Sequence, residues 1–347
     1  MMQAAVFHEH GGPEVLRIED VPRPAPGPGE VLVRVRAIAV NRTLDCEVRS
    51  RPGAYGPIPM PHILGSGPAG EVAELGEGVQ GFQPGDRVVT SNGFRCGTCS
   101  SCTSGENNPC LNMRIQGVHT QGGYAEFALA PFRNLLRLPD NLSFEEATAL
   151  MVMAPTAWHL LIDRAQLRAG ETVLILAAGG ALGTMGVQVA KLAGARVIAA
   201  AGADSKLTKA RQLGADEEVN YRTSKMSDEV RRLTDGQGVD VVFENLAVPD
   251  LWAESLASAG VGGRIVTAGA LGGGSVEMNM RSFYLKQLSL LGSTGAPPRQ
   301  VQLVYRLAGE GKLHAVIDRC LPLAEASAAQ VLVESRDIFG RVVLTVA

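Results

Sequence analysis

Hydrophobic and polar residues alternate over short distances in the first third of the chain. Residues 31–40 (VLVRVRAIAV) place Val31 and Val33 on one face and Arg34 on the other, which is the pattern of a half-buried strand. Proline and glycine crowd the segments on either side, and shorter strand-like runs follow at residues 69–75, 86–90 and 122–130. This part of the chain is therefore predicted to be rich in β structure.

The pattern changes at residue 143. Ser143 and Glu146 form a capping box, S-x-x-E, which predicts a helix through the apolar residues that follow. From residue 171 onward, apolar β-branched runs alternate with helical segments. The runs lie at residues 172–177, 196–201, 239–244, 263–268 and 288–293, and the first helices at 183–193 and 205–213. This alternation predicts an α/β fold with a parallel, doubly wound sheet.

Size and composition narrow the functional classes. A chain of 347 residues favours two domains, and a hydrophobic content of 46% suits well-buried cores. The net charge of −3 gives no reason to expect nucleic acid or an anionic membrane as a partner. The N-terminus lacks the features of an export signal, and the longest apolar stretch, residues 147–162, is too short to span a bilayer. We therefore expect a soluble, cytoplasmic protein.

Four cysteines are spaced C-x-x-C-x-x-C-x7-C, an order that suits a metal. Their thiolates can converge tetrahedrally on one zinc ion; they are Cys96, Cys99, Cys102 and Cys110. The surrounding segment is rich in Gly, Ser and Asn and has no apolar period, so a closed metal site would supply the order that it lacks. Four protein ligands leave no open position, and this zinc is therefore predicted to be structural.

Other uses of these cysteines fit less well. Two disulfides would need an oxidising compartment, for which the chain shows no export signal. An iron–sulfur cluster with the same first spacing expects its fourth cysteine three residues on, followed by proline, whereas Pro109 precedes Cys110 here. A redox pair would not need four thiols. The remaining thiols, Cys46 and Cys320, are isolated and are expected to be ordinary side chains.

A glycine-rich turn follows the strand that ends at Ala177. It reads A-x-G-x-x-G, the dinucleotide fingerprint with alanine in place of the first glycine. Gly180 would let the backbone approach a pyrophosphate, and Gly183 would let the helix pack on the strand. The phosphates would then lie at the helix N-terminus. The cofactor-binding residues predicted in this turn are Ala178, Gly180, Ala181, Leu182 and Gly183.

The end of the next strand predicts the form of the cofactor. An acid there would hold the ribose hydroxyls of NAD, but the strand runs out through Gly202 and has no carboxylate before Asp204. Lys206 follows and could neutralise a 2′-phosphate, although a solvated lysine at a helix start is the plainer alternative. We therefore predict NADP(H), with Gly202 and Lys206 in its site.

Taken together, these segments resemble the medium-chain dehydrogenase/reductase superfamily along nearly the whole chain. The segments GGPEVLRIEDVPRPAPGPGEVLVRV, HILGSGPAGEVAELGEGV and GGYAEF are similar to its catalytic domain, and AAGGALGTMGVQVAKLAGARVIA to its cofactor domain. The likeness is greatest to quinone oxidoreductases and enoyl reductases, whereas the cysteine lobe resembles the structural-zinc lobe of zinc alcohol dehydrogenases. The resemblance implies a GroES-like β-barrel catalytic domain and a Rossmann NADP-binding domain. The expected boundaries are 1–150 with 294–347 for the former, including a zinc lobe at 92–111, and 151–293 for the latter.

The resemblance also implies where a catalytic zinc would lie, and its ligands are missing. The zinc alcohol dehydrogenases use a Cys after the first long strand, a His in a G-H-E triplet and a Cys near the start of the cofactor domain. These positions hold Asn41, Ser66 and Val152 here, none of which is a usual zinc ligand. Cys46 and His62 lie nearby but off the motif positions. No catalytic zinc is therefore expected.

Hydride transfer without a metal suits an acceptor that stabilises its own negative charge. An enone delocalises the incoming electrons into an enolate and a quinone into a hydroquinone, so the protein needs only to orient the acceptor and donate hydrogen bonds. The resemblance implies four residues for this task, namely Asn41, Thr43, Tyr55 and Thr156. Asp45 resembles the acid that fixes this loop, although relatives usually have one residue fewer between the Asn and the Asp.

Each of these residues has a structural alternative. Asn41 could close a strand-end turn, Thr43 and Asp45 could cap backbone groups, and Tyr55 could anchor a Pro/Gly loop. Three histidines are expected to be structural: His62, His119 and His159. Further residues resemble cofactor contacts, with the last of them facing the phosphates: Tyr221, Asn245, Gly269 and Arg341.

The leading interpretation is an NADPH-dependent reductase of quinones or α,β-unsaturated carbonyls. Two other functions stay open. An alcohol dehydrogenase in the broad sense would interconvert alcohol and carbonyl, and a redox-state sensor would bind NADPH without turnover. The substrate is in each enzymatic case a small molecule, and the resemblance implies a homodimer or homotetramer.

Overall fold

The computed structural model describes residues 1–104 and 109–347, and the chain folds into two compact units. The first unit consists of Met1–Val152 together with Pro297–Ala347, and the second of Met153–Ala296. Each unit has its own sheet and its own hydrophobic core. The predicted α/β class is confirmed.

The second unit contains a six-stranded parallel sheet in the order β13-β12-β11-β14-β15-β16. Its strands are β11 (Thr172–Leu176), β12 (Arg196–Ala201), β13 (Glu217–Asn220), β14 (Val239–Phe243), β15 (Ala259–Thr267) and β16 (Ser289–Gly292). The order reverses at β11, which pairs with β12 on one side and β14 on the other. Ligands of doubly wound sheets bind at this switch point, beyond the carboxyl ends of the strands. The parallel sheet predicted from the sequence is confirmed.

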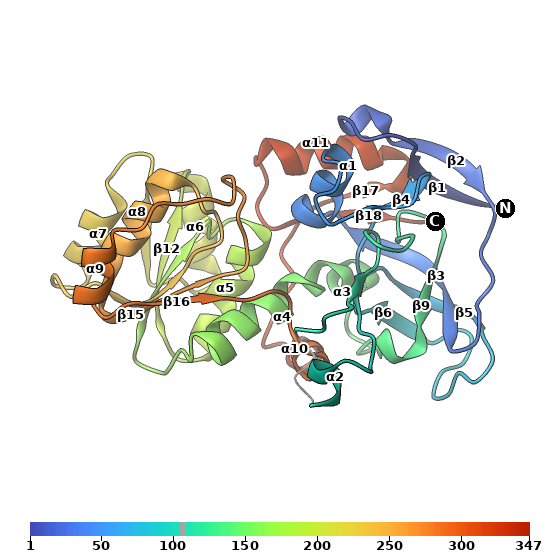
Figure 1. Ribbon diagram of the computed structural model, residues 1–347, viewed down its shortest axis with the longest axis horizontal. Coiled ribbons are helices and arrows are strands. Elements are labelled where there is room, and N and C mark those ends of the chain that lie inside the picture. The colour runs from blue at the N-terminus through green and yellow to red at the C-terminus, as the bar shows by residue number, and fades with distance from the viewer. Residues whose placement is uncertain (105–108) are drawn as a thin grey trace. The chain divides into compact units, whose positions relative to one another are not determined.

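Helices connect these strands, as parallel pairing requires (Figure 1). They are α4 (Met153–Trp158), α5 (Ala181–Leu192), α6 (Asp204–Gln212), α7 (Met226–Leu233), α8 (Pro249–Ser258) and α9 (Met280–Leu285), with a π-helix, η4 (His159–Arg164), after α4. Leu174 and Val242 of the central strands pack in one buried cluster with Trp252 of α8. Since β11 and β12 are buried on both faces, their sequences are continuous apolar runs.

The first unit is built mainly from antiparallel strands. The larger sheet has the order β10-β6-β5-β3-β18-β17, with β9 also paired to β3. Its strands are β3 (Glu30–Ala39), β5 (Ala69–Leu75), β6 (Arg87–Thr90), β9 (Phe127–Pro131), β10 (Leu135–Arg137), β17 (Ile317–Pro322) and β18 (Arg341–Thr345). A smaller sheet has the order β2 (Arg17–Val21), β1 (Met2–Phe7) and β4 (His62–Ile63). Another consists of the short strands β7 (Gly93–Phe94) and β8 (Arg114–Ile115).

β3 lies at the centre of this unit and pairs with β5, β9 and β18. The predicted strand is present, but the expectation that only one of its faces is buried was wrong. Val31 and Val33 belong to one buried cluster, Ile38 belongs to another, and Leu32 is fully buried beside the exposed Arg34. The reason is tertiary, because packed side chains cover both faces of the sheet around β3.

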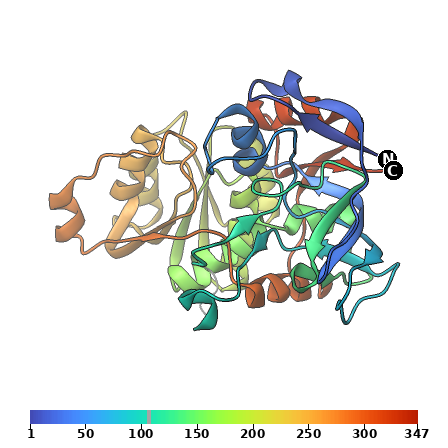
Figure 2. The ribbon, with the colours of Figure 1, turned by 45° about the vertical axis from the view of Figure 1, so that its right-hand side comes forward.

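The helices of the first unit are α1 (Val48–Ser50), α2 (Ser100–Thr103), α3 (Phe144–Leu150), α10 (Pro298–Gly309) and α11 (Ala326–Ser335). α3 begins with the capping box. The N–H of Glu146 donates to Ser143 Oγ (3.1 Å) and the N–H of Ser143 donates to the Glu146 carboxylate (2.8 Å). α11 packs against β18 and against the turn Pro13–Val15, which joins segments from the two ends of the chain (Figure 2). In the described part of the chain no helix is both long and apolar enough to cross a bilayer.

Candidate functional site

The segment after β3 forms a π-helix, η2 (Arg42–Glu47), whose N-cap is Asn41. The N–H of Cys46 donates to the carbonyl of Asn41 five residues earlier (3.2 Å), which is the π-type bond. A π-helix accommodates one extra residue within a helical turn. The resemblance implies one residue more between Asn41 and Asp45 than relatives have, and a π-helix would absorb it here. The Asp45 side chain is fully buried in the unit.

Asp45 is fully buried and joins three segments of the first unit. Its Oδ2 accepts hydrogen bonds from the N–H of Asn41 (2.7 Å) and the hydroxyl of Tyr124 (3.1 Å), and its Oδ1 accepts one from the N–H of Gly65 (3.2 Å). Burial raises the pKa of this carboxyl to about 6, against the opposing effect of these donors and of the Arg341 charge. The carboxylate therefore fixes the strand end, the Gly65 turn and Tyr124 relative to one another.

Arg341, at the start of β18, reaches the same place from the other end of the chain. Its Nη2 donates to the side-chain oxygen of Asn41 (3.0 Å), and the guanidinium is buried. Burial lowers the pKa of Arg341 to about 10, while the charges of Asp45 and Tyr124 act the other way. The structure gives Arg341 a partner inside the first unit, and the phosphate contact that the resemblance implied gains no support from this geometry.

The side-chain amide of Asn41 is engaged at both ends. Its oxygen accepts from Arg341, and its nitrogen donates to the carbonyl of Ala39 (3.2 Å). The residue has no exposed surface. The structure therefore favours the alternative in which Asn41 closes the strand end, over a donor to a substrate carbonyl.

The three positions that hold zinc ligands in the alcohol dehydrogenases come together in the fold. The N–H groups of Asn41 and Gly65 both donate to Asp45, which places Asn41 near the residue before Ser66. A Cβ added at Gly67, the residue after Ser66, would lie 2.5 Å from Met151, the residue before Val152. The Ser66 hydroxyl between these glycines donates to the carbonyl of Gln116. An amide bonded to a guanidinium, a hydroxyl bonded to a carbonyl and an apolar side chain do not fit a catalytic zinc.

Two predicted residues of the first unit, Thr43 and Tyr55, lie near each other, since the Thr43 side chain opposes the upward shift of the Tyr55 pKa. Burial and the nearby charge of Glu47 raise the pKa of Tyr55, so its phenol is protonated at neutral pH. A hydroxyl pair of this kind can donate a proton or a hydrogen bond to a substrate oxygen.

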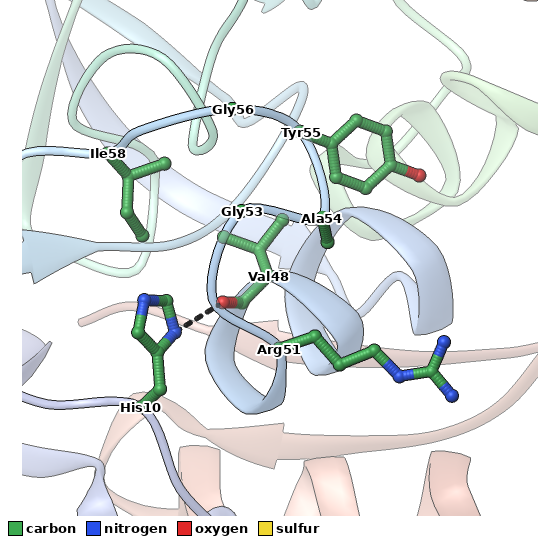
Figure 3. A pocket seen from close by; sticks show the side chains of 8 residues that line it. All are labelled: His10, Val48, Arg51, Gly53, Ala54, Tyr55, Gly56 and Ile58. Atoms are coloured by element: carbon green, nitrogen blue, oxygen red, sulfur yellow. Dashed lines mark hydrogen bonds between the residues drawn. The ribbon is translucent and has the colours of Figure 1, made fainter.

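A shallow surface hollow with essentially no enclosed volume lies beside the loop that carries Tyr55. His10 and Ile58 are among the side chains that line it, whereas the ring of Tyr55 is directed away from both (Figure 3). Sites for drug-sized ligands are typically about 300 Å³ or larger. The hollow is therefore too small to be the substrate pocket.

The four cysteines converge as predicted. Their sulfur atoms all lie within 4.8 Å of one another. Cys96 lies 3.6 Å from Cys110 and 4.0 Å from Cys102, and Cys99 lies 3.9 Å from Cys110. Four thiolates at Zn–S bonds of about 2.3 Å would be spaced by roughly 3.8 Å, so the arrangement fits one tetrahedral zinc.

This cluster defines the cysteine lobe, residues 92–111, of which 105–108 fall outside the described residues. Among the described residues, the four cysteines form the one group of three or more Cys, His or carboxylate side chains close enough to hold a metal. A zinc held by four thiolates would order the lobe and would leave no position for substrate.

The glycine turn of the second unit suits a dinucleotide phosphate. A Cβ at Gly183 would lie 2.2 Å from the carbonyl oxygen of Ala177, so only glycine lets α5 pack this closely on β11. Gly180 is the N-cap of α5 and offers no side-chain cap to the free N–H groups of the first turn. Ala178 is buried, with its N–H bonded to Ala200 (3.0 Å). The turn presents Ala181 and Leu182 at a helix N-terminus open to an anion.

Asn245 and Gly269 follow β14 and β15 at the same edge of the sheet. The side-chain oxygen of Asn245 accepts from the N–H of Ala268 (2.9 Å), while its buried Nδ2 has no protein partner. A Cβ at Gly269 would lie 2.6 Å from the Asn245 carbonyl oxygen. A buried amide donor without a partner at the switch point fits a polar ligand there, such as a bound cofactor.

Two cationic side chains, Lys206 and Arg222, lie near the end of β12. The stem of Lys206 lies against Gly179, where a Cβ would come within 2.8 Å of it. A Cβ at Gly202 would lie 3.0 Å from both the ring of Tyr221 and the Nε of Arg222. Arg222 was not singled out from the sequence, although its place directly after Tyr221 at the end of β13 was a usable signal.

An acid near this edge, Asp204, is bonded elsewhere. The carboxylate of Asp204 accepts a hydrogen bond from Asn220 on β13 (2.6 Å). Thr156, the fourth predicted catalytic residue, lies buried in α4 of the second unit.

The predicted structural histidines all have protein partners. His62 is fully buried, with its Nε2 3.1 Å from the Gly117 carbonyl, and burial lowers its pKa. His159 lies 3.4 Å from Asp163, one turn on. The Nε2 of His119 lies 3.0 Å from the backbone carbonyl of Tyr55.

Both units match families of known proteins. Residues 27–140 match the alcohol dehydrogenase GroES-like domain, and residues 181–310 match the zinc-binding dehydrogenase family. An NAD-dependent alcohol dehydrogenase of Sulfolobus acidocaldarius is 34% identical over 99% of this chain and 100% of its own length. The chain belongs to the medium-chain dehydrogenase/reductase superfamily. The resemblance seen in the sequence is thus confirmed.

Other relatives of this medium-chain dehydrogenase/reductase carry different names. An acryloyl-coenzyme A reductase of Metallosphaera sedula is 32% identical over 99% of this chain and 100% of its own. A quinone oxidoreductase of Rattus norvegicus is 33% identical over 99% and 98%. A crystal structure named as an NAD-dependent alcohol dehydrogenase matches with a TM-score of 0.94 and 43% identity, covering 100% of both chains. The protein is therefore an oxidoreductase that depends on a nicotinamide cofactor.

If the four cysteines hold a zinc, replacing Cys99 by Ser should lower the zinc content and the melting temperature, because three thiolates would close the site less tightly and the lobe has no apolar period to order it. Metal analysis and calorimetry of the purified protein measure both effects. Cys320→Ser is the matched control, since Cys320 is exposed and isolated. Full zinc content in the Cys99 variant would contradict the assignment.

Asp45 should make stability depend on pH. Its folded pKa, about 6, lies above the ordinary aspartate value of 3.8, so between these values the folded protein holds a proton that the unfolded chain has lost. Its contribution to stability is therefore fully present below about pH 4 and is lost as the pH rises through about 6. The unfolding free energy of the wild type minus that of Asp45→Asn, measured in urea, should fall across this window. A difference that stays flat would remove the assignment.

Proposed function

We propose that the protein is an NADPH-dependent reductase of quinones or α,β-unsaturated carbonyls that works without a catalytic metal. One observation carries the proposal. The positions of the catalytic-zinc ligands hold Asn41, Ser66 and Val152, and the guanidinium of Arg341 bonds to Asn41 there. The chain itself thus supplies a cation here, the buried guanidinium of Arg341, and the side chains at the three positions are not zinc ligands.

The missing ligands limit the chemistry. Oxidation of an alcohol by a zinc enzyme depends on the ion to stabilise an alkoxide. A bound nicotinamide supplies hydride to a conjugated acceptor without that help. In an enone, hydride adds to the β-carbon, the π electrons move to oxygen, and a proton then completes the α-carbon. In a quinone, one hydride and one proton give the hydroquinone.

The side chains of the protein would bind the acceptor and supply the proton. Tyr55, which lies near Thr43, carries a protonated phenol that can donate to the acceptor oxygen. Thr156, buried in α4 of the second unit, stays a prediction from the resemblance. The unpartnered Nδ2 of Asn245 and the helix N-terminus at Gly180 would bind the cofactor.

Two relatives support the choice of substrate class. The rat relative is named for quinones, and the Metallosphaera relative for acryloyl-coenzyme A, whose acryloyl group is itself an α,β-unsaturated carbonyl. Turnover is supported as well, since the relatives are named as enzymes, and this weighs against a sensor that only binds NADPH.

An alcohol dehydrogenase is the second candidate, favoured by the 43% identity to a structure of that name. Metal analysis separates the two, because a reductase of this kind should hold about one zinc per chain and a zinc alcohol dehydrogenase about two. The same preparation is assayed with NADPH against quinones and enals, and with NADP⁺ and NAD⁺ against alcohols. About two zinc ions, or turnover of alcohols alone, would overturn the proposal.

A preference for NADP(H) is part of the proposal. Lys206 and Arg222 stand at the end of β12, where an acid would hold the ribose of NAD, and Asp204 is bonded to Asn220 instead. Cations at this edge suit a 2′-phosphate. Two relatives are named as NAD-dependent, and their names favour NAD over NADP(H).

Lys206→Ala and Arg222→Ala should each raise KM for NADPH about tenfold, because each removes a charged hydrogen-bond donor, and should leave KM for NADH nearly unchanged. Steady-state kinetics with both cofactors measures the difference. Lys225→Ala, which removes an exposed cation of the same unit, is the control. Equal effects on NADPH and NADH would contradict the 2′-phosphate site.

We also retain a homo-oligomer and a cytoplasmic location as proposals. Strand β16 is an edge of the parallel sheet and exposes Leu290, and the helix that precedes it in the chain, α9, exposes further apolar side chains: Met280, Tyr284 and Leu285. An unpaired edge with apolar neighbours favours pairing with a second copy. Six free cysteines suit a reducing compartment.

A further inference from the structure

Tyr55 lies in a loop, residues 51–61, that contains no helix or strand. The loop runs from α1 to β4 and is stabilised internally by short turns, in which the N–H of Ala54 donates to Arg51 (3.3 Å) and that of Gly56 to Gly53 (3.1 Å). Glycine and proline give such a loop little rigidity of its own. A side chain that must meet Thr43 and a substrate therefore depends on outside contacts for its position.

His119 provides such a contact. Its Nε2 lies 3.0 Å from the carbonyl oxygen of Tyr55, and its Nδ1 lies 2.9 Å from the N–H of Ile115. Because the Ile115 N–H is a donor, Nδ1 must be the unprotonated nitrogen, so Nε2 carries the hydrogen and donates it to Tyr55. The imidazole thus bridges the backbone of the Tyr55 loop and the backbone of β8.

β8 is in turn attached to the cysteine lobe. The lobe begins with β7 and is followed by β8, and these strands pair at Gly93 with Ile115 and at Phe94 with Arg114. Thiolates brought together on one metal would hold the ends of this two-stranded pair in register. Ile115, whose N–H donates to His119, belongs to this pair, so the register of the pair sets the position of Ile115.

The other end of the loop rests on the same segment. Gln121 accepts from the N–H of Ile63 (2.6 Å) and donates to the carbonyl of Pro61 (3.0 Å). His62 Nε2 lies 3.1 Å from the carbonyl of Gly117. Residues 115–121 therefore form a support beneath the loop, and His119 is the part of that support which bonds to Tyr55.

We propose that His119 is a positioning residue that holds Tyr55 against Thr43, and that through it the cysteine lobe sets the geometry of the candidate active site. The metal would then act on catalysis from a site with no open ligand position. The importance of Tyr55 itself rests on the proposed function, whereas the link from lobe to loop does not.

Two substitutions of His119 separate its two bonds. Asn is short, so its side-chain oxygen can accept from Ile115 in place of Nδ1, but it cannot reach Tyr55. Gln is longer, so its amide can donate to Tyr55 in place of Nε2 and leaves Ile115 without its acceptor. His119→Asn and His119→Gln therefore remove one bond each from the same site, and comparing them cancels a general loss of packing.

Hydrogen–deuterium exchange of the peptide covering residues 52–60 tests the link without any assay of activity. Exchange should be about fivefold faster in His119→Asn, the effect of one lost hydrogen bond, and near wild type in His119→Gln. It should also be faster in Cys99→Ser, in which the lobe is opened. His8→Gln is the control, because His8 is exposed and bonds to Glu19 on β2.

Equal exchange in the Asn and Gln variants would overturn the role of His119, and an unchanged loop in Cys99→Ser would overturn the link to the lobe. If a variant does not fold, as judged by circular dichroism, the comparison is made by adding a chelator to the wild-type holoenzyme. Loop exchange that does not respond to removal of the metal would overturn the link in the same way.

Kinetics then connects the link to the proposed function. In His119→Asn, kcat should fall with KM for NADPH unchanged, and His119→Gln should restore most of it. Tyr55→Phe keeps the carbonyl that His119 contacts and loses only the hydroxyl. If Tyr55→Phe leaves kcat unaltered, the catalytic role of Tyr55 fails, while the exchange result still decides whether His119 positions the loop.

Discussion

The hydrogen bonds to the buried carboxylate of Asp45 are the interactions on which the candidate site of the first unit depends. A charge taken out of water is costly unless donors and an opposite charge surround it. Asp45 receives three hydrogen bonds and lies near the buried guanidinium of Arg341. These bonds fix the end of β3, the Gly65 turn and Tyr124 in one arrangement. The strand end is therefore held by side chains of the protein itself.

The second unit works on a different principle. Its sheet is apolar, and the proposed cofactor site is made largely of backbone: the N-terminus of α5, the close approach at Gly183 and the strand ends that carry Gly202 and Gly269. The amide of Asn245 and the cations at β12 are the side chains that would discriminate between ligands there. A fold of this kind can change its cofactor preference through a few residues at one edge while its core stays the same.

The cysteine lobe and the Tyr55 loop are both segments without an apolar core, and each obtains its order from elsewhere. The lobe has four thiolates that fit one metal, and the loop has the support of residues 115–121. The two are joined through β8. A metal held by the four cysteines and the proposed role of Tyr55 would therefore be coupled through β8 and His119.

The sequence alone determined what depends on near neighbours: the capping box at Ser143, the cysteine spacing, the glycine turn before α5 and the parallel sheet. The first three are patterns within a few turns of chain, which local geometry converts directly into structure, and the sheet follows from the alternation of apolar runs with helical segments. Only the tertiary structure decided that Asn41 bonds Arg341, 300 residues away, and that Arg222 lies beside Gly202. Such pairs are set by how whole sheets pack, and no local pattern records which distant side chain will arrive.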